Sequence, residues 1–251
     1  MNVLARHRQT DQLGWPRWAL WAIPLTFPAL WFAAMCYSRI DEKHFRWLAR
    51  EDGWIEYAQA LCYALGAGLS AWIAWRLRQT PDRRWSVLYV LFALALFWVA
   101  GEEISWGQRL LQFPTPAWLT SHNLQGETNL HNLPGVARTI HRWVGRGLRL
   151  MIALSVLVWW VMPGWVARRR RAHLWMPHPA LIPAWVCFLG FWPLHRWYVE
   201  SWYAHAAEPV RVIHRMDEVR EFVFALGVAV FFGMVWRAVR REALHSKAER
   251  P

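Results

Sequence analysis

Long apolar stretches alternate with short polar segments along the whole chain. A helix needs about 20 mostly apolar residues to cross the hydrocarbon core of a bilayer. Six stretches reach or approach that length. The pattern therefore predicts an all-α integral membrane helix bundle, one polytopic domain over 1–251, with spanning helices at 18–37, 54–75, 85–102, 148–166, 179–198 and 219–239.

Basic residues gather in alternate connections between these stretches. The pair Arg83–Arg84 follows the second stretch, and the run Arg168–Arg171 follows the fourth, whereas most acidic residues fall in the other connections. Because Lys and Arg are retained on the cytoplasmic side of a bilayer, both chain ends are expected in the cytoplasm. The segment between the third and fourth helices then becomes a long outer loop. The expected location is the inner (plasma) membrane.

Composition agrees with a membrane protein and argues against two other classes. Of 251 residues, 56% are hydrophobic and 22 are Trp, which is more apolar surface than one soluble core of this size can bury. The net charge of +12 is typical of nucleic-acid binding, but the Arg residues stand between apolar stretches instead of on one basic face. Many Trp residues flank the stretches, as in an aromatic belt. The expected partner is therefore the lipid bilayer, with no nucleic acid.

The sequence Gly-Glu-Glu-Ile-Ser-Trp-Gly-Gln-Arg at 101–109 ends the third stretch. Carboxylates at a helix C-terminus oppose the helix dipole, and two adjacent acids at the edge of the hydrocarbon are costly unless paired, protonated or bound to a cation. Glu102 and Glu103 are therefore candidate general bases, and Arg109 is a candidate for holding an anionic group. An ion pair between Glu and Arg is the structural alternative.

A polar run follows in the long loop. Polar side chains alternate with other residues from 123 to 131, so an extended backbone would place them on one face. In a helix, Glu127 and His131 would instead pair at i, i+4, a common spacing of metal ligands. Either arrangement makes Glu127 and His131 candidate ligands of a divalent metal such as Zn, Mn or Fe. The same polar pocket is expected to include Gln108, Asn123, Gln125, Asn129 and Asn132.

Two more acidic segments open predicted helices on the same side of the membrane. Glu56 lies at the start of the second stretch, and Glu221 lies at the start of the sixth. Acids in the first turn of a helix complement its dipole, which is the structural interpretation. Their carboxylates are also suited to a metal, so Glu56 and Glu221 are predicted as further ligands. The pocket is expected to include His214, Asp217 and Glu218 as well.

The motif at 101–109 and the later pattern Asn-x-Gln-x-Glu-x-Asn-x-His-Asn at 123–132 resemble the signature of a family of uncharacterised bacterial multi-pass membrane proteins. Glu51-Asp52-Gly-x-x-Glu56 fits the same family. The resemblance covers the first three stretches and the long loop, and it implies a polytopic membrane topology without an established activity. The acids and His are also loosely similar to those of ceramidase-like membrane hydrolases, but the chain lacks their His-x-x-x-His pair.

Three functions are compatible with these residues. The first is a metal-dependent hydrolase or transferase that acts on a lipid or lipid-linked substrate at the outer membrane surface. The second is a non-catalytic assembly or sensor component with an internal polar staple. The third is a proton- or cation-coupled transporter, which would spread its acids over the membrane depth. We expect one polar pocket near the outer interface that gathers Glu56, Glu102, Glu103, Glu127, His131 and Glu221.

Overall fold

The structure is a computed structural model of the 251-residue chain. It describes residues 17–50, 53–80, 83–123, 126–139, 145–162, 165–166, 174–188, 197, 201 and 209–248. Within these residues all regular secondary structure is helical and no strand occurs. The all-α prediction is therefore confirmed for the described part of the chain.

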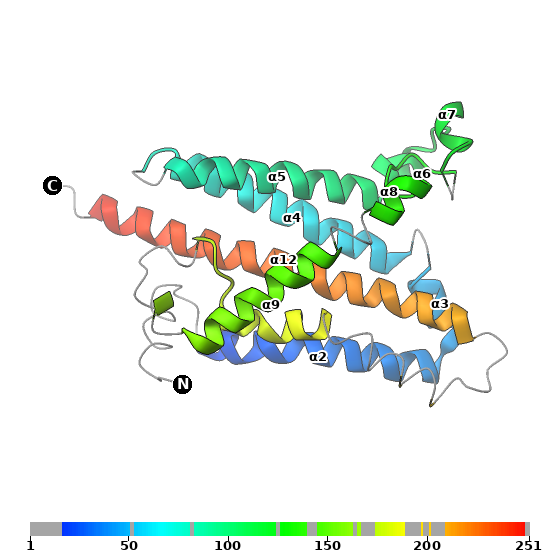
Figure 1. The fold of residues 1–251 in the computed structure, drawn as a ribbon, viewed down its shortest axis with the longest axis horizontal. Coiled ribbons are helices and arrows are strands. Elements are labelled where there is room, and N and C mark those ends of the chain that lie inside the picture. Colours follow the sequence, from blue (N-terminus) through cyan, green and yellow to red (C-terminus); the bar gives the residue numbers. More distant parts are fainter. Residues whose placement is uncertain are drawn as a thin grey trace.

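Three long helices form one layer of the bundle. α4 (Trp54–Leu77) lies between α5 (Arg83–Glu103) and α12 (Pro209–Ala248) and packs against both (Figure 1). By length and composition, α4, α5 and the segment Arg215–Leu244 of α12 can each cross a membrane. The structure therefore contains three candidate membrane-spanning helices within its described residues.

Apolar and aromatic side chains hold this layer together. Ile73 of α4, Tyr89 of α5 and Phe232 of α12 are buried in one cluster, and the Tyr89 and Phe232 ring centroids are 6.0 Å apart. The Tyr89 hydroxyl donates a hydrogen bond to the backbone oxygen of Leu174 at 3.0 Å. A buried Tyr needs such a partner for its hydroxyl group. This polar contact ties the segment around residue 174 to the bundle.

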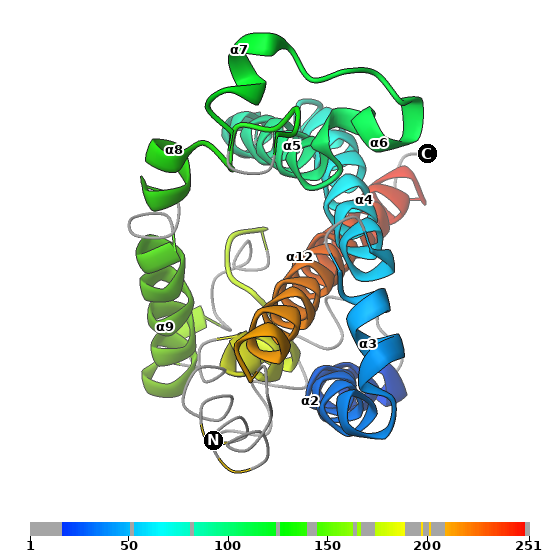
Figure 2. The ribbon, with the colours of Figure 1, turned by 90° about the vertical axis from the view of Figure 1, so that its right-hand side faces the viewer.

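A second layer lies on the other side of α12. It contains α2 (Arg17–Ile40), which runs nearly parallel to α12, and α9 (Gly145–Val161), which crosses it obliquely (Figures 1 and 2). Phe27 of α2, Ile152 of α9 and Val223 of α12 belong to one buried apolar cluster. The layers are therefore joined by a continuous core. The short helix α3 connects α2 to the segment that precedes α4, and it covers Glu42–Leu48.

The observed helices differ from the predicted ones at their ends. The predicted helix 219–239 lies inside α12, which has 40 residues, because charged turns extend the apolar segment in both directions. Hydropathy does not mark such turns. The predicted helix 148–166 corresponds to α9, whose 17 residues give a length of about 26 Å, slightly less than the hydrocarbon thickness. The predicted helix 18–37 corresponds to α2.

The predicted helix 179–198 is only partly described. It begins with the short 3-10 helix η4 (Pro179–Leu181) and continues as helix over 182–188. Residues 189–196 lie outside the described part of the chain. Six spanning helices and the orientation with both ends in the cytoplasm therefore stay predictions.

The chain after α5 forms a distinct structure, here called the cap, over the described residues 105–123 and 126–131. It contains the 3-10 turn η1 (Ser105–Gly107), α6 (Gln108–Leu111) and α7 (Ala117–Thr120). The cap sits at the end of the bundle where α5 ends and α4 begins, and it projects sideways beyond α5 (Figures 1 and 2). After the cap, α8 (Pro134–Thr139) leads toward α9.

Candidate functional site

The motif at 101–109 forms a sharp turn between α5 and α6. Ser105, Trp106 and Gly107 have φ angles of 46°, 55° and 80°. A left-handed backbone is costly for residues with a Cβ atom, and Ser105 and Trp106 both carry one. Such a backbone persists only where its surroundings fix it. Here the Ser105 and Trp106 side chains both form hydrogen bonds to carboxylates of the site.

Glu102 fastens the cap to the end of α5. Its Oε1 accepts a hydrogen bond from Trp106 Nε1 at 2.8 Å, and its Oε2 accepts from the backbone N–H groups of Leu130 and His131 at 2.7 and 2.8 Å. The Nδ1 atom of His131 lies 3.5 Å from the same oxygen. Glu102 is buried, and both of its carboxylate oxygens are engaged. This geometry favours a structural role over the predicted role of a general base.

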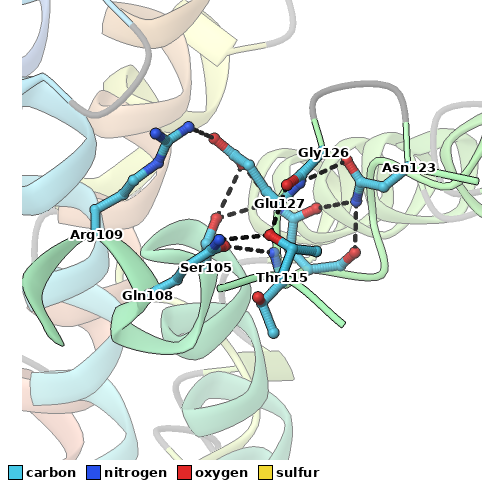
Figure 3. A network of polar contacts seen from close by, with 9 residues as sticks. Ser105, Gln108, Arg109, Thr115, Asn123, Gly126 and Glu127 are labelled. Carbon is cyan, nitrogen blue, oxygen red and sulfur yellow. Dashed lines mark hydrogen bonds and ion pairs between the residues drawn. The ribbon is translucent and has the colours of Figure 1, made fainter. Parts of the chain in front are cut away.

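Glu127 is the centre of the cap. Its Oε2 accepts hydrogen bonds from Ser105 Oγ at 2.9 Å and Asn129 Nδ2 at 2.8 Å, and its Oε1 accepts from Arg109 at 2.9 Å (Figure 3). The Glu127 side chain is buried, whereas that of Arg109 is half exposed. Glu127 was predicted as a metal ligand and Arg109 as an anion-binding group. In the structure the two form an ion pair with each other, whereas the structural alternative expected from the sequence pairs Arg109 with a Glu of its own motif.

Amide side chains bond to the irregular backbone of the cap. Asn123 Nδ2 donates to the backbone and side-chain oxygens of Asn129 at 2.8 and 2.9 Å, and Asn123 Oδ1 accepts from the N–H group of Glu127 at 3.2 Å. Gln108 Oε1 accepts from the N–H group of Thr128 at 2.7 Å. A loop without regular structure needs such partners for its buried backbone groups. Gln108, Asn123 and Asn129 therefore shape the cap.

A second group of polar side chains lies where α4, α5 and α12 meet near the cap. The Glu103 carboxyl group forms a hydrogen bond with Gln59 and interacts electrostatically with Glu56, Glu221 and His131. Glu218 interacts electrostatically with Glu221, Glu56 and Glu103. Four acids from three helices thus face one region, here called the acidic centre: Glu56 of α4, Glu103 of α5, and Glu218 and Glu221 of α12.

Arginines on α12 offset part of this negative charge. Arg220 lies 3.1 Å from Asp217 Oδ1 and 3.1 Å from Glu221 Oε1. Arg215 donates to the backbone of the segment that follows α3. Within the described residues, no basic side chain forms an ion pair with Glu103. Glu103 therefore has an amide side chain as its hydrogen-bond partner and several carboxylates as neighbours.

The remaining predicted residues do not complete a metal site. Gln125 and the side chain of His214 lie outside the described residues. Asn132 follows the cap directly and is partly exposed. In the part of the chain that the structure describes, no three His, Cys, Asp or Glu side chains lie close enough together to hold a metal ion. The predicted divalent metal stays a prediction.

Two residues of the acidic centre were missed by the sequence reasoning. Gln59 is 1% exposed, and its Oε1 atom has no hydrogen-bond partner among the described residues. The buried Tyr63 interacts electrostatically with Glu103 and Glu221. The spacing in the sequence could have indicated both residues, because Glu56, Gln59 and Tyr63 follow one another at intervals of three and four residues. Such residues share one face of a helix.

No family model, curated protein or solved structure matches this chain. Its class is therefore defined by its own geometry. Within its described residues, the chain is all-helical, with three candidate membrane-spanning helices, a hydrogen-bonded cap and an acidic centre at the same end of the bundle.

His131 makes the cap sensitive to pH. Burial lowers the pKa of His131, but the hydrogen bond with Glu102 and the charges of Glu103, Glu102 and Glu127 outweigh it, so the pKa lies above the ordinary 6.5. Protonated His131 therefore stabilises the fold below pH 6.5, and this contribution is lost as pH rises through the folded-state pKa. The melting temperature should therefore fall as pH rises above 6.5 and through the raised pKa of His131, and it should fall less in His131→Gln. Equal pH dependence of the two proteins would contradict this assignment.

Gly101 leaves room for the ring of Trp106. A Cβ atom at Gly101 would lie 2.8 Å from that ring, which packs against Phe97 and Trp98. Gly101→Ala should therefore lower the free energy of unfolding by about 1–3 kcal/mol, the usual cost of overpacking. Gly68→Ala is the matched control, because no atom lies within 4 Å of its added Cβ. Thermal melts should show a loss for Gly101→Ala only; similar losses for both would refute the packing argument.

Proposed function

We propose that this chain is a multi-pass protein of the inner (plasma) membrane that catalyses hydrolysis or group transfer on a lipid or lipid-linked substrate. It would have six spanning helices, both ends in the cytoplasm and the acidic centre at the outer surface. The observation that carries the proposal is a contrast between two adjacent carboxylates. Glu102 has hydrogen bonds on both oxygens, whereas Glu103 has one with Gln59 and faces three other carboxylates.

The cost of this arrangement supports a chemical role for Glu103. A carboxylate at the centre of the hydrocarbon is destabilised by about 2.5–3.5 kcal/mol and one near its edge by less, and a partner of opposite charge would relieve much of that cost. Glu103 instead faces several like charges, which the nearby His131 offsets only in part. Carboxylates in such surroundings are typical of catalytic acids and bases. We therefore assign the role of general base to Glu103.

The proposed reaction uses two groups for proton transfer. Glu103 accepts the proton of a water molecule or hydroxyl group as its oxygen attacks the electrophilic atom of the substrate. His131 donates a proton to the leaving group, and its raised pKa favours the protonated ring that this step needs. Proton exchange with solvent then restores both groups. Because the described ligands do not converge on one metal position, no step is assigned to a metal.

A non-catalytic assembly or sensor component is the second candidate function. The bonding of the cap favours it, because Glu102, Glu127 and Asn129 are all buried and hydrogen-bonded, as in a structural element. In that case the cap would present a rigid surface to another protein. The two candidate functions differ in the role of Glu103, because only the catalytic function requires its carboxylate as a base.

Lipid conversion in liposomes tests the catalytic proposal. Purified protein is reconstituted into liposomes of a total bacterial lipid extract, and the lipids are followed by mass spectrometry. Wild type should convert at least one lipid class, and the double variant Glu103→Gln/His131→Gln should convert none. Glu42→Gln, a solvent-accessible acid of α3, is the matched control and should keep the activity. Equal conversion by wild type and the double variant, or none by wild type, would refute the proposal.

A further inference from the structure

One face of α5 carries a continuous apolar stripe. Large apolar side chains are exposed at intervals of three and four residues, so they lie along one side of the helix. α5 is also the least buried of the three candidate spans, and its main packing partner is α4. In a membrane this stripe would face lipid. Its exposed members are Val87, Val90, Leu91, Leu94, Phe97 and Trp98.

The cap extends this stripe past the end of the helix. The Trp106 ring lies against Phe97 and Trp98, with ring centroids 6.0 and 5.1 Å apart. Beyond it, Leu110 is 62% exposed and Leu111 is 75% exposed. The stripe therefore continues onto Trp106, and two exposed leucines follow it in α6, four and five residues further along the chain.

The position of the cap places this surface beside the bundle. Both views show α6 at the end of α5 and α7 beyond α5 on the side away from α12, so the cap overhangs that side of α5 (Figures 1 and 2). Trp118 of α7 is 61% exposed. If α5 crosses a membrane, the space between the overhanging cap and the side of α5 lies at the boundary between lipid headgroups and acyl chains. Trp is enriched at that depth.

We infer that the cap docks on the lipid surface next to α5, with Leu110, Leu111 and Trp118 inserted at the boundary between headgroups and acyl chains. The buried polar groups of the cap support this placement, because Glu127 and the amides already bond to one another inside the cap. Irregular backbone at membrane depth needs such internal partners. The inference rests on the proposed membrane location, and it would bring lipid substrates to the end of the bundle that holds Glu103.

Depth-dependent fluorescence quenching tests this inference. Leu111→Cys is introduced after the three natural cysteines are replaced, labelled with a nitrobenzoxadiazole dye and reconstituted into phosphatidylcholine liposomes. A nitroxide near the headgroup end of the acyl chain should remove most of the fluorescence, and aqueous iodide should remove little. Leu94→Cys, in the stripe of α5, is the lipid-facing reference, and Gln79→Cys, in the turn after α4, is the aqueous reference. Leu110→Cys repeats the reading at a neighbouring position.

Each result decides a separate point. Lipid quenching at Leu111 and Leu94 supports docking of the cap. Lipid quenching at Leu94 with iodide quenching at Leu111 overturns the docking alone and leaves the membrane location intact. Iodide quenching at both positions overturns the docking together with the membrane location of α5. None of these readings uses the activity of Glu103, so a failure of the catalytic proposal is distinguished by the lipid-conversion assay.

Discussion

Glu127→Ala should lower the free energy of unfolding by about 2–6 kcal/mol, mainly because two buried donors lose their acceptor. The substitution removes the acceptor of Ser105, Asn129 and Arg109 at once. Ser105 and Asn129 are buried, so water cannot readily replace the lost carboxylate. Each buried donor left without a partner costs about 1–3 kcal/mol. Arg109 is half exposed and contributes less.

The loss should be visible in the cap before it affects the bundle. Thermal melts and limited proteolysis of the reconstituted protein measure it, and cleavage within 105–131 should accelerate. Glu42→Ala is the control, because it removes an exposed pair with Arg46 at 3.6 Å. Exposed pairs contribute at most about 1 kcal/mol. If Glu127→Ala melts within the range of Glu42→Ala, Glu127 does not hold the cap together.

Glu103→Gln should reduce the rate of lipid conversion by about 10²–10⁴-fold, the usual contribution of a general base. Gln is similar in size to Glu and keeps a hydrogen bond with Gln59, but it cannot accept the proton. The same change removes one negative charge from the acidic centre, so the stability of the protein should stay constant or rise. Initial rates normalised to folded protein separate the two effects. A variant that melts normally and keeps full activity would exclude Glu103 as the base.

The helical cores could be predicted from the sequence, whereas their ends could not. The apolar runs at 54–75 and 85–102 exceed or approach the length needed to span a bilayer, and α4 and α5 contain them. α12 begins ten residues before the predicted position 219, because turns with charged side chains continue the helix without changing its backbone. Hydropathy indicates whether a segment lies in lipid or in water. It does not show where the backbone hydrogen bonds of a helix end.

The cap shows what residue spacing alone leaves open. Glu102 and Trp106 stand four residues apart and form a hydrogen bond, and Ser105 and Arg109, also four residues apart, both bond to Glu127. The left-handed turn at 105–107 was not foreseen, because its residues are not all Gly. Between 126 and 131 the backbone is irregular, so the helical pairing of Glu127 with His131 does not occur.

The acidic centre was only partly visible in the sequence. Acids at the starts of α4 and α12 have a structural explanation in the helix dipole, and nothing in the spacing shows which helices meet. The approach of Glu103 to Glu218 and Glu221 depends on the packing of α4 against both α5 and α12. Long-range contacts of this kind are set by the tertiary fold.

The central claim is that neighbouring acids have different tasks, Glu102 in holding the cap and Glu103 in chemistry. The most direct measurement is the melting temperature of Glu102→Gln and Glu103→Gln, purified side by side. Glu102→Gln places an amide where three donors point, so it should melt clearly below wild type. Glu103→Gln should melt at or above wild type. Equal losses of melting temperature in both variants would contradict this division of roles. Glu102 and Glu103 would then both belong to one structural network of hydrogen bonds.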